Sequence, residues 1–322
     1  MGNTVARPRS TLEDYAVSEQ ACLQQASPSR MTASALRLRT SEWILLAYFA
    51  YIALLAQWLH VPRSVSLLAP LVNAAVMVGW LVLAWAESLR GNRFFSVLRD
   101  WYPAPLMLLA YREIGWFAPA HHLHRWEAAW VVWDKKLLND WGLRSTIEAL
   151  GPLLPALLEL AYLLVYSTPL FSLLMLYVYR RRERVDRFLT LFLLAILVPY
   201  ALFPYFPSEP PRTVFPGQDF PSFETWVRRL NWWLLEGQGI RTSVFPSAHV
   251  AGGFAAAFGM MRYLKEHPWV GRFLGALALL IATAVVYGRY HYAADALAGL
   301  ACALVAVLLS SFVDRYRQQA RG

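Results

Sequence analysis

Two short motifs near the C-terminal end of this 322-residue chain place polar side chains between long apolar runs. The first, FPSAH, contains Ser247 and His249. The second, GRYHYAADALAG, contains Arg289, His291 and Asp295. Ionisable groups next to lipid are costly and usually have a function. The chemistry of these five side chains is therefore the first question that the sequence raises.

His291 and Asp295 are four residues apart, so on a helix they share one face. Because helical side chains lean toward the N-terminus, Asp295 would reach back over His291. A carboxylate bonded to one imidazole nitrogen fixes the tautomer and leaves the other nitrogen free to attack an electrophile. A structural Asp–His pair at a helix start is the alternative interpretation.

The PSAH segment is typical of a helix start, with Ser247 as the N-cap after Pro246. A helix N-terminus offers free N–H groups and positive potential, which favour a bound phosphate. His249 stands in the first turn, where it could donate a proton to a leaving oxygen. The alternative is a plain cap with a histidine near the lipid headgroups.

Two arginines could hold the charge of a phosphate. Arg289 precedes His291 by two residues, and Arg212 follows a double proline in EPPRTVFPG. Each alone is more typical of an arginine that snorkels toward headgroups, but arginine also grips phosphate oxygens with a fork of donors. The whole set favours phosphoryl transfer through a phosphohistidine. In this hypothesis His291 attacks phosphorus, His249 protonates the leaving group, and the arginines and Ser247 hold the phosphate.

The composition indicates an all-α protein that crosses the membrane several times. Hydrophobic residues make up 57% of the chain and charged residues only 16%, with 14 Trp and 16 Tyr, whereas soluble domains carry roughly a quarter charged residues. The net charge of +9 comes from arginines clustered between apolar runs, a pattern that sets orientation in membranes. We therefore expect a lipid bilayer as the partner and no nucleic acid.

A membrane-spanning helix needs about 20 apolar residues. Seven clear candidates and one weaker one fit this length: 43–60, 65–86, 153–179, 188–206, 246–263, 270–287 and 292–313, with the weaker run at 103–118. The weaker run contains Arg112 and Glu113. Arg112 could pair with Glu159 of a neighbouring span, which would let the weak span tolerate its charge.

The distribution of arginine predicts the topology. The basic segments are 1–41, 87–100, 180–187, 262–272 and the C-terminal end. Basic loops stay in the cytoplasm, and all of them do so only if 103–118 also crosses. We therefore predict eight spans in a membrane domain over 42–313. Cytoplasmic tails would flank it at 1–41, which is expected to be mobile, and at 314–322.

Three segments then face outward together: 119–152, 207–245 and 288–292. The first includes EAAWVVWDKKLLNDWG, whose apolar residues recur at helical spacing and predict a helix on the membrane surface. The orientation brings the polar motifs within 207–299 to one face at one depth. The predicted active site therefore lies on the extracytoplasmic side of the cell membrane.

FPSAH and YGRYHYAADALAG resemble the second and third signatures of the type-2 phosphatidic acid phosphatase superfamily. They are most similar to its inositolphosphotransferase branch, which contains the inositol phosphorylceramide synthases. The resemblance implies a six-helix catalytic core, phosphate binding by Ser247, proton donation by His249, and a nucleophile and orienting acid at His291 and Asp295. It implies a lipid phosphate substrate and calls for no metal or other cofactor.

The chain departs from the family pattern at two places. The third signature usually has an arginine six residues before its histidine, where this chain has Val285. Arg289 lies four residues later, about one helical turn along the same face, and could substitute. The first signature, K-x6-R-P, is absent, since Thr213 follows Arg212. This weakens the assignment as an ordinary phosphatidate phosphatase. The P-P-R pattern that ends at Arg212, after a span end rich in Phe and Pro, resembles the phosphotransferase branch instead.

Transfer of a phosphoinositol-type or other phospho-headgroup between lipids is thus the leading hypothesis. Simple hydrolysis of a lipid phosphate, such as phosphatidate or a polyprenyl diphosphate, is the alternative. Vanadate-dependent haloperoxidation and non-enzymatic lipid transport are more distant ones. HHLH at 121–124 resembles a metal-binding cluster, but no acidic or cysteine partner stands at ligand spacing, so we expect no metal there.

Overall fold

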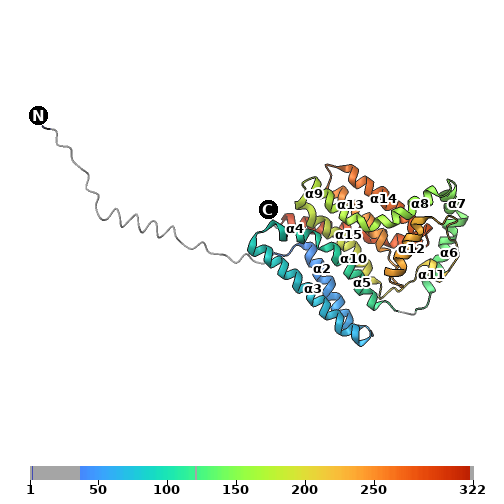
Figure 1. The fold of residues 1–322 in the computed structure, drawn as a ribbon, viewed down its shortest axis with the longest axis horizontal. Helices are drawn as coiled ribbons and strands as arrows, with labels where there is room; N and C mark the ends of the chain where they lie inside the picture. Colours follow the sequence, from blue (N-terminus) through green and yellow to red (C-terminus); the bar gives the residue numbers. More distant parts are fainter. Residues whose placement is uncertain (1, 3–36, 120–121, 320–322) are drawn as a thin grey trace. The chain divides into compact units, whose positions relative to one another are not determined.

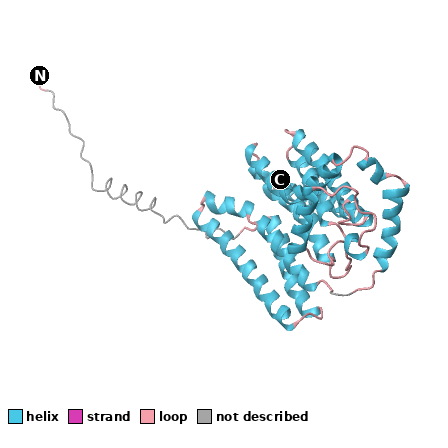
Figure 2. Cartoon of the chain, turned by 45° about the vertical axis from the view of Figure 1, so that its right-hand side comes forward, coloured by secondary structure: helices cyan, strands magenta, loops and turns pink. Residues whose placement is uncertain are grey.

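A computed structural model describes residue 2 and residues 37–119 and 122–319 of the chain. The chain divides into two compact units, Met1–Arg37 and Leu38–Gly322. Most of the predicted tail 1–41 falls outside the described residues, and the first described helix begins inside it, at Thr40. Within the second unit the described residues form helices and loops without strands, as Figure 2 shows.

Six helical segments are long and apolar enough to cross a membrane. They are α2 (Thr40–Trp58), α3 (Arg63–Leu89 of Arg63–Arg90), α8 to α9 (Leu153–Leu164 and Thr168–Val178, joined by η3, Val165–Ser167), η4 with α10 (Arg182–Arg184 and Val185–Leu202), α14 (Pro268–Tyr287) and α15 (Ala293–Gln319). The all-α, multi-span bundle is confirmed. The other two predicted spans are the shorter helices α5 (Pro103–Ile114) and α13 (Ala248–Tyr263), so the number eight stays a prediction.

Helix α13 lies at the centre of the bundle, packed against α10, α14 and α15 (Figure 1). Its sequence, AHVAGGFAAAFGMMRY, is rich in small residues, which let helix backbones approach closely within a membrane. At Gly259 an added Cβ would lie 2.8 Å from the Phe188 ring of α10. The small residues of α13 therefore allow the start of this helix, with His249, to lie deep among its neighbours.

One end of the bundle gathers shorter helices and long loops. These are α6 (Arg125–Lys135), the π-helical η2 (Lys136–Asp140), α7 (Leu143–Glu148), α11 (Pro211–Val214) and α12 (Trp226–Gln238), at the right of Figure 1. Asn139 donates to Asp219 (2.6 Å), and the Ser222 hydroxyl donates to Glu148 (2.8 Å). The predicted outward segments 119–152 and 207–245 therefore do meet at one end.

The predicted surface helix is confirmed as a helix, formed by α6 and η2. Trp133 and Trp141 of the predicted apolar face are exposed. The buried positions are Glu127, Val131, Asp134 and Leu138. The carboxylate of Asp134 thus faces the protein interior, where Arg289 and the Ala293 amide donate hydrogen bonds to it.

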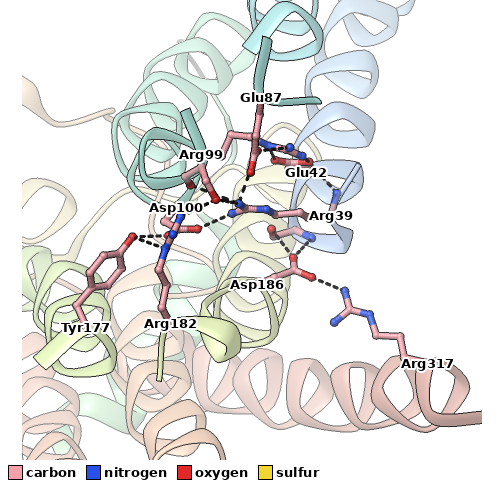
Figure 3. A network of polar contacts seen from close by, with 11 residues as sticks. Arg39, Glu42, Glu87, Arg99, Asp100, Tyr177, Arg182, Asp186 and Arg317 are labelled. Carbon is pink, nitrogen blue, oxygen red and sulfur yellow. Dashed lines mark hydrogen bonds and ion pairs between the residues drawn. The ribbon is translucent and has the colours of Figure 1, made fainter. Parts of the chain in front are cut away.

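The predicted inward segments meet at the opposite end, in the polar network of Figure 3. Asp100 of α4 (Arg93–Trp101) accepts from Arg39 and from Arg182, each at 2.5 Å, and also from the Tyr177 hydroxyl. Nearby, Asp186 accepts from Arg317 at 2.6 Å. The segments that the charge pattern groups together as inward therefore lie at one end of the bundle, and the predicted outward segments lie at the other.

Candidate active site

His249 and His291 lie side by side at the end of the bundle that carries α6 and α12. His291 Nε2 is 3.3 Å from His249 Nδ1, and the two ring centroids are 5.4 Å apart. His291 belongs to the short connection between α14 and α15 and is buried. The structure thus brings together the predicted nucleophile and the predicted acid, which are 42 residues apart in the sequence.

The hydrogen bonds of the pair define one consistent proton arrangement. His291 Nδ1 is 2.9 Å from the carbonyl oxygen of Val244, which can only accept, so this nitrogen carries the proton. The Nε2 lone pair of His291 is then free and can accept from the Nδ1–H of His249. His249 Nε2 in turn accepts from the Tyr166 hydroxyl at 3.0 Å. Sequence reasoning missed Tyr166 because a tyrosine within an apolar span reads as a packing residue.

The ring of His291 is kept neutral by its surroundings. Burial, and then the positive charges that His249 and Arg212 can place beside it, lower the pKa of His291 well below its usual value. A neutral imidazole has the lone pair that nucleophilic attack requires.

Asp295 is held next to His291 but plays a smaller part in fixing its tautomer than expected. Its Oδ2 is 3.4 Å from His291 Nδ1 and accepts from the Tyr292 amide at 2.8 Å. Helix α15 begins at Ala293, so His291 lies just before the helix rather than on its face. The Val244 carbonyl is the nearer partner of Nδ1, with Asp295 behind it.

Ser247 is the N-cap of α13, as predicted. Its hydroxyl accepts from the Val250 amide at 3.3 Å, and its own amide donates to the Asp295 carbonyl at 3.0 Å. A Cβ at Gly299 would lie 2.3 Å from the Ser247 carbonyl oxygen, so only glycine allows this close approach. The start of α13 and the start of α15 are therefore locked together, which sets His249 against His291.

Arg212 is the arginine that the structure brings to the histidines. Its guanidinium lies over the Tyr290 ring, 5.5 Å from the centroid, and its amide donates to the Arg289 carbonyl at 3.3 Å. Among the described residues, no carboxylate lies within ion-pair distance of this guanidinium. Its charge is thus available to an anion.

Arg289 occupies a different environment from the one expected. Helix α14 ends at Tyr287, so Arg289 does not continue its face, and its φ of 64° is left-handed. The fully buried guanidinium donates to Asp134 at 2.6 Å, and Asp134 also accepts from the Ala293 amide at 2.9 Å. This ion pair stabilises the tight turn that carries His291, a conformation that is unfavourable for a non-glycine residue.

A cavity of about 500 Å³ opens at the two histidines and runs between the helices. Its polar wall is formed by Tyr111, Tyr162, Tyr166, Tyr200, Arg212, His249, Tyr290 and His291. The rest of its lining is mostly apolar and comes from α5, α8, α9, α10 and α13, including Leu108, Leu170, Phe192 and Ile196. Reactive polar groups on the wall of a largely apolar cavity suit an amphiphilic substrate.

The sequence model of the PAP2 superfamily matches residues 121–309. The chain belongs to the PAP2 superfamily. No curated protein and no solved structure matches it. The matched region runs from just before α6 into α15 and includes both histidines, whereas α2 to α5 precede it. Membership in the PAP2 superfamily implies a membrane enzyme of the lipid phosphatase or phosphotransferase type.

One predicted contact in this PAP2 protein is wrong. Glu159 pairs with Arg228 of α12 at 2.7 Å rather than with Arg112. It also accepts from the hydroxyl of Tyr290 at 2.6 Å, and the Tyr290 ring stacks on Tyr162 at 4.1 Å. The buried carboxylate therefore supports the aromatic stack on which Arg212 rests. Its true partner lies 69 residues away, beyond the reach of a pattern-based prediction.

Proposed function

We propose that this PAP2 protein transfers a phospho-headgroup, of the phosphoinositol type or a similar kind, between lipids through a phosphohistidine on His291. The observation that carries the proposal is the pairing of His291 and His249 on the wall of a largely apolar cavity. A lipid tail would occupy the apolar part and place its headgroup phosphate beside the histidines. Arg212, on the cavity wall, would neutralise the phosphate oxygens.

In the first step His291 Nε2 attacks phosphorus while the bond from phosphorus to the leaving oxygen breaks. His249 acts here in its doubly protonated, cationic form, which the charge of the bound phosphate stabilises. Its Nδ1 proton goes to the leaving oxygen, which also takes the electron pair of the broken bond, and His249 becomes neutral. His291 then carries the phosphoryl group on Nε2 and a proton on Nδ1, so its ring is cationic. The Val244 carbonyl and the Asp295 carboxylate lie 2.9 and 3.4 Å from that nitrogen and stabilise the positive charge.

In the second step an acceptor hydroxyl attacks the phosphohistidine. His249, now without its Nδ1 proton, removes the hydroxyl proton as the new oxygen–phosphorus bond forms and the phosphorus–nitrogen bond breaks. The Tyr166 hydroxyl, 3.0 Å from Nε2, holds the His249 ring in place through both steps. His291 returns to its starting state, so the cycle needs no metal or other cofactor.

The cavity favours a lipid hydroxyl over water as the acceptor. Most of its surface is apolar, so a second lipid can reach the histidines through the bundle while water is disfavoured there. The phenols of Tyr111, Tyr166 and Tyr200 offer donors and acceptors to the hydroxyls of a polyol headgroup. The P-P-R motif at Arg212 adds the resemblance to the inositolphosphotransferase branch.

Within this proposal Ser247 and Arg289 have different roles. Ser247, at the N-terminus of α13, presents the positive end of that helix to the phosphate. Arg289 keeps two buried N–H groups, on Nε and Nη2, without a partner among the described residues. We assign it to positioning, through Asp134, of the turn that carries His291, and phosphate binding by Arg289 stays a prediction.

We further propose that both termini face the cytoplasm and that the histidines face the extracytoplasmic side. The basic segments that favour a cytoplasmic position meet at the end shown in Figure 3. The histidines lie at the other end, next to α6 and α12. Each end therefore has the charge character that this orientation requires.

Product analysis tests the proposed function. Purified full-length protein would receive phosphatidylinositol labelled in its phosphate, with ceramide or no acceptor added. Transfer predicts a labelled lipid product that depends on the acceptor and is lost in His291→Ala. Release of labelled water-soluble phosphate, independent of the acceptor, would instead establish a lipid phosphatase. No turnover of phosphatidylinositol, phosphatidate or polyprenyl diphosphate would refute both.

The roles of the two histidines can be distinguished by the choice of leaving group in the substrate. General-acid assistance is worth roughly 10²–10⁴-fold with a poor leaving group and little with a good one. An aryl phosphate with an acidic phenol should therefore rescue His249→Ala in part and His291→Ala not at all. Equal rescue of both variants would contradict the division of roles proposed here.

A further inference from the structure

A second cluster of ionisable side chains lies outside the cavity, where α6 meets the start of the 207–245 loop. Donor atoms of His122, His124 and Glu209 all lie within 4.8 Å of one another. Glu127 joins them, since its Oε1 is 2.5 Å from His122 Nε2 and 3.5 Å from His124 Nδ1. None of the four residues lines the cavity described above.

The cluster buries more negative charge than its surroundings balance. Glu127 is fully buried and Glu209 is 7% exposed. Among the described residues, the arginine that contacts Glu209 is Arg241 at 3.2 Å, and its side chain is 73% exposed. Two buried carboxylates are costly unless cations or donors compensate them. A divalent cation between the carboxylates and the two imidazoles would supply that compensation.

Two buried polar atoms without hydrogen-bond partners support the same conclusion. His122 Nδ1 and Glu127 Oε2 are buried and have no hydrogen-bond partner among the described residues. Such atoms are rare in proteins and require an explanation. Glu127 Oε1 meanwhile accepts from the Glu209 amide at 3.1 Å, so this carboxylate is fixed between the histidines and the loop.

We propose that His122, His124 and Glu209, with Glu127 as a fourth or supporting ligand, bind a structural Zn²⁺ ion. Imidazole nitrogens and carboxylate oxygens are common zinc ligands, and the ion prefers four of them at about 2.0–2.2 Å. Donors around such an ion lie about 3.3 Å apart, so small side-chain rotations would close the present arrangement. Binding would displace the proton shared by His122 and Glu127.

The metal would connect two parts of the chain that carry the active site. His124 precedes α6, which also holds Asp134 and thereby the Arg289 turn. Glu209 precedes Arg212 by three residues, two of which are prolines with fixed φ. The ion would therefore stabilise the folded outer segments without taking part in the chemistry. This inference does not depend on the proposed reaction.

Direct zinc binding tests the proposal with the full-length protein in detergent, after removal of any affinity tag and treatment with a chelator. Titration of Zn²⁺ against a competing chelating dye should show one ion per chain. Affinity should fall more than about tenfold in His122→Ala, His124→Ala and Glu209→Gln. His60→Ala, which removes an exposed histidine between α2 and α3, is the matched control and should bind as the parent does.

X-ray absorption of the bound ion provides the second readout. It should show only nitrogen and oxygen neighbours at about 2.0–2.2 Å, and Zn²⁺ should raise the thermal midpoint of the parent but not of His124→Ala. The His124 side chain is 43% exposed, so its removal should leave the fold intact. Less than one ion per chain, or equal affinity in all the variants, would overturn the proposal.

Discussion

Asp295→Asn is the most informative single change in this PAP2 protein, because the structure separates its charge from its hydrogen bonds. One oxygen, Oδ2, makes both the contact with His291 Nδ1 and the bond from the Tyr292 amide. The other, Oδ1, has no partner among the described residues. An asparagine can place its oxygen at the Oδ2 position and its amide nitrogen at the Oδ1 position. The change then removes the negative charge and little else.

The expected loss of rate follows from that difference. Charge-assisted hydrogen bonds are roughly twice as strong as neutral ones, so stabilisation of the cationic phosphohistidine should fall by about 1–2 kcal/mol. That corresponds to roughly 5- to 30-fold in kcat. A catalytic aspartate that alone fixes the histidine tautomer costs about 10⁴-fold when changed to asparagine. Here the Val244 carbonyl keeps the proton on His291 Nδ1, so the larger loss is not expected.

The assay is steady-state turnover of a lipid phosphate by the parent, Asp295→Asn and His291→Ala, with thermal unfolding of each as a check on folding. A folded Asp295→Asn protein that loses activity as completely as His291→Ala would show that the carboxylate, and not the carbonyl, controls the tautomer. An unchanged kcat would show that the charge does not act on the reacting ring. Either result would refute the reasoning above.

Four further outcomes are expected. Tyr166→Phe removes one hydrogen bond to the general acid, worth about 0.5–1.5 kcal/mol, so kcat should fall roughly 2- to 12-fold with a lipid phosphate and stay unchanged with an activated aryl phosphate. In a pH profile of kcat/KM the acidic limb should lie below the usual histidine pKa, because the nucleophile is deprotonated there; Arg212→Gln removes a positive neighbour, raises the pKa of His291 and should move that limb to higher pH. With saturating substrate, kcat should survive EDTA, and complete loss restored by Mg²⁺ would contradict a phosphohistidine mechanism. In intact cells an impermeant thiol reagent should label Gln218→Cys and not Arg184→Cys, and the reverse pattern would contradict the proposed orientation.

The sequence predicted the parts of the fold that depend on local composition. Apolar runs located the helices, and arginine clusters sorted the loops between the two ends of the bundle. The N-cap at Ser247 was predictable because its chemistry is complete within a few residues. The approach of His249 to His291 followed from orientation, since both motifs had to lie at the same end.

Contacts across long separations could not be predicted in this way. Asp134 lies on a helix that the sequence places at the membrane surface, and its partner Arg289 is 155 residues away. The left-handed turn at Arg289 lacks the glycine that usually marks one. HHLH has a nearby acidic partner after all, because Glu127 stands three residues after His124 and contacts it, whereas Glu209 reaches the cluster only through folding.

The ion-pair network of Figure 3 shows that the region shared with the family does not coincide with the part of the chain that folds together. The shared family region begins at residue 121, yet Arg182 within it takes Asp100 from outside as its partner, and α10 packs against α2. The folded unit therefore extends beyond the N-terminal limit of the family match. A gene fragment that starts at residue 121 would encode a catalytic region with an uncovered apolar flank and an arginine deprived of its carboxylate. The first helices are therefore part of the same folded body as the matched region, and a fragment without them would lack part of its own interior.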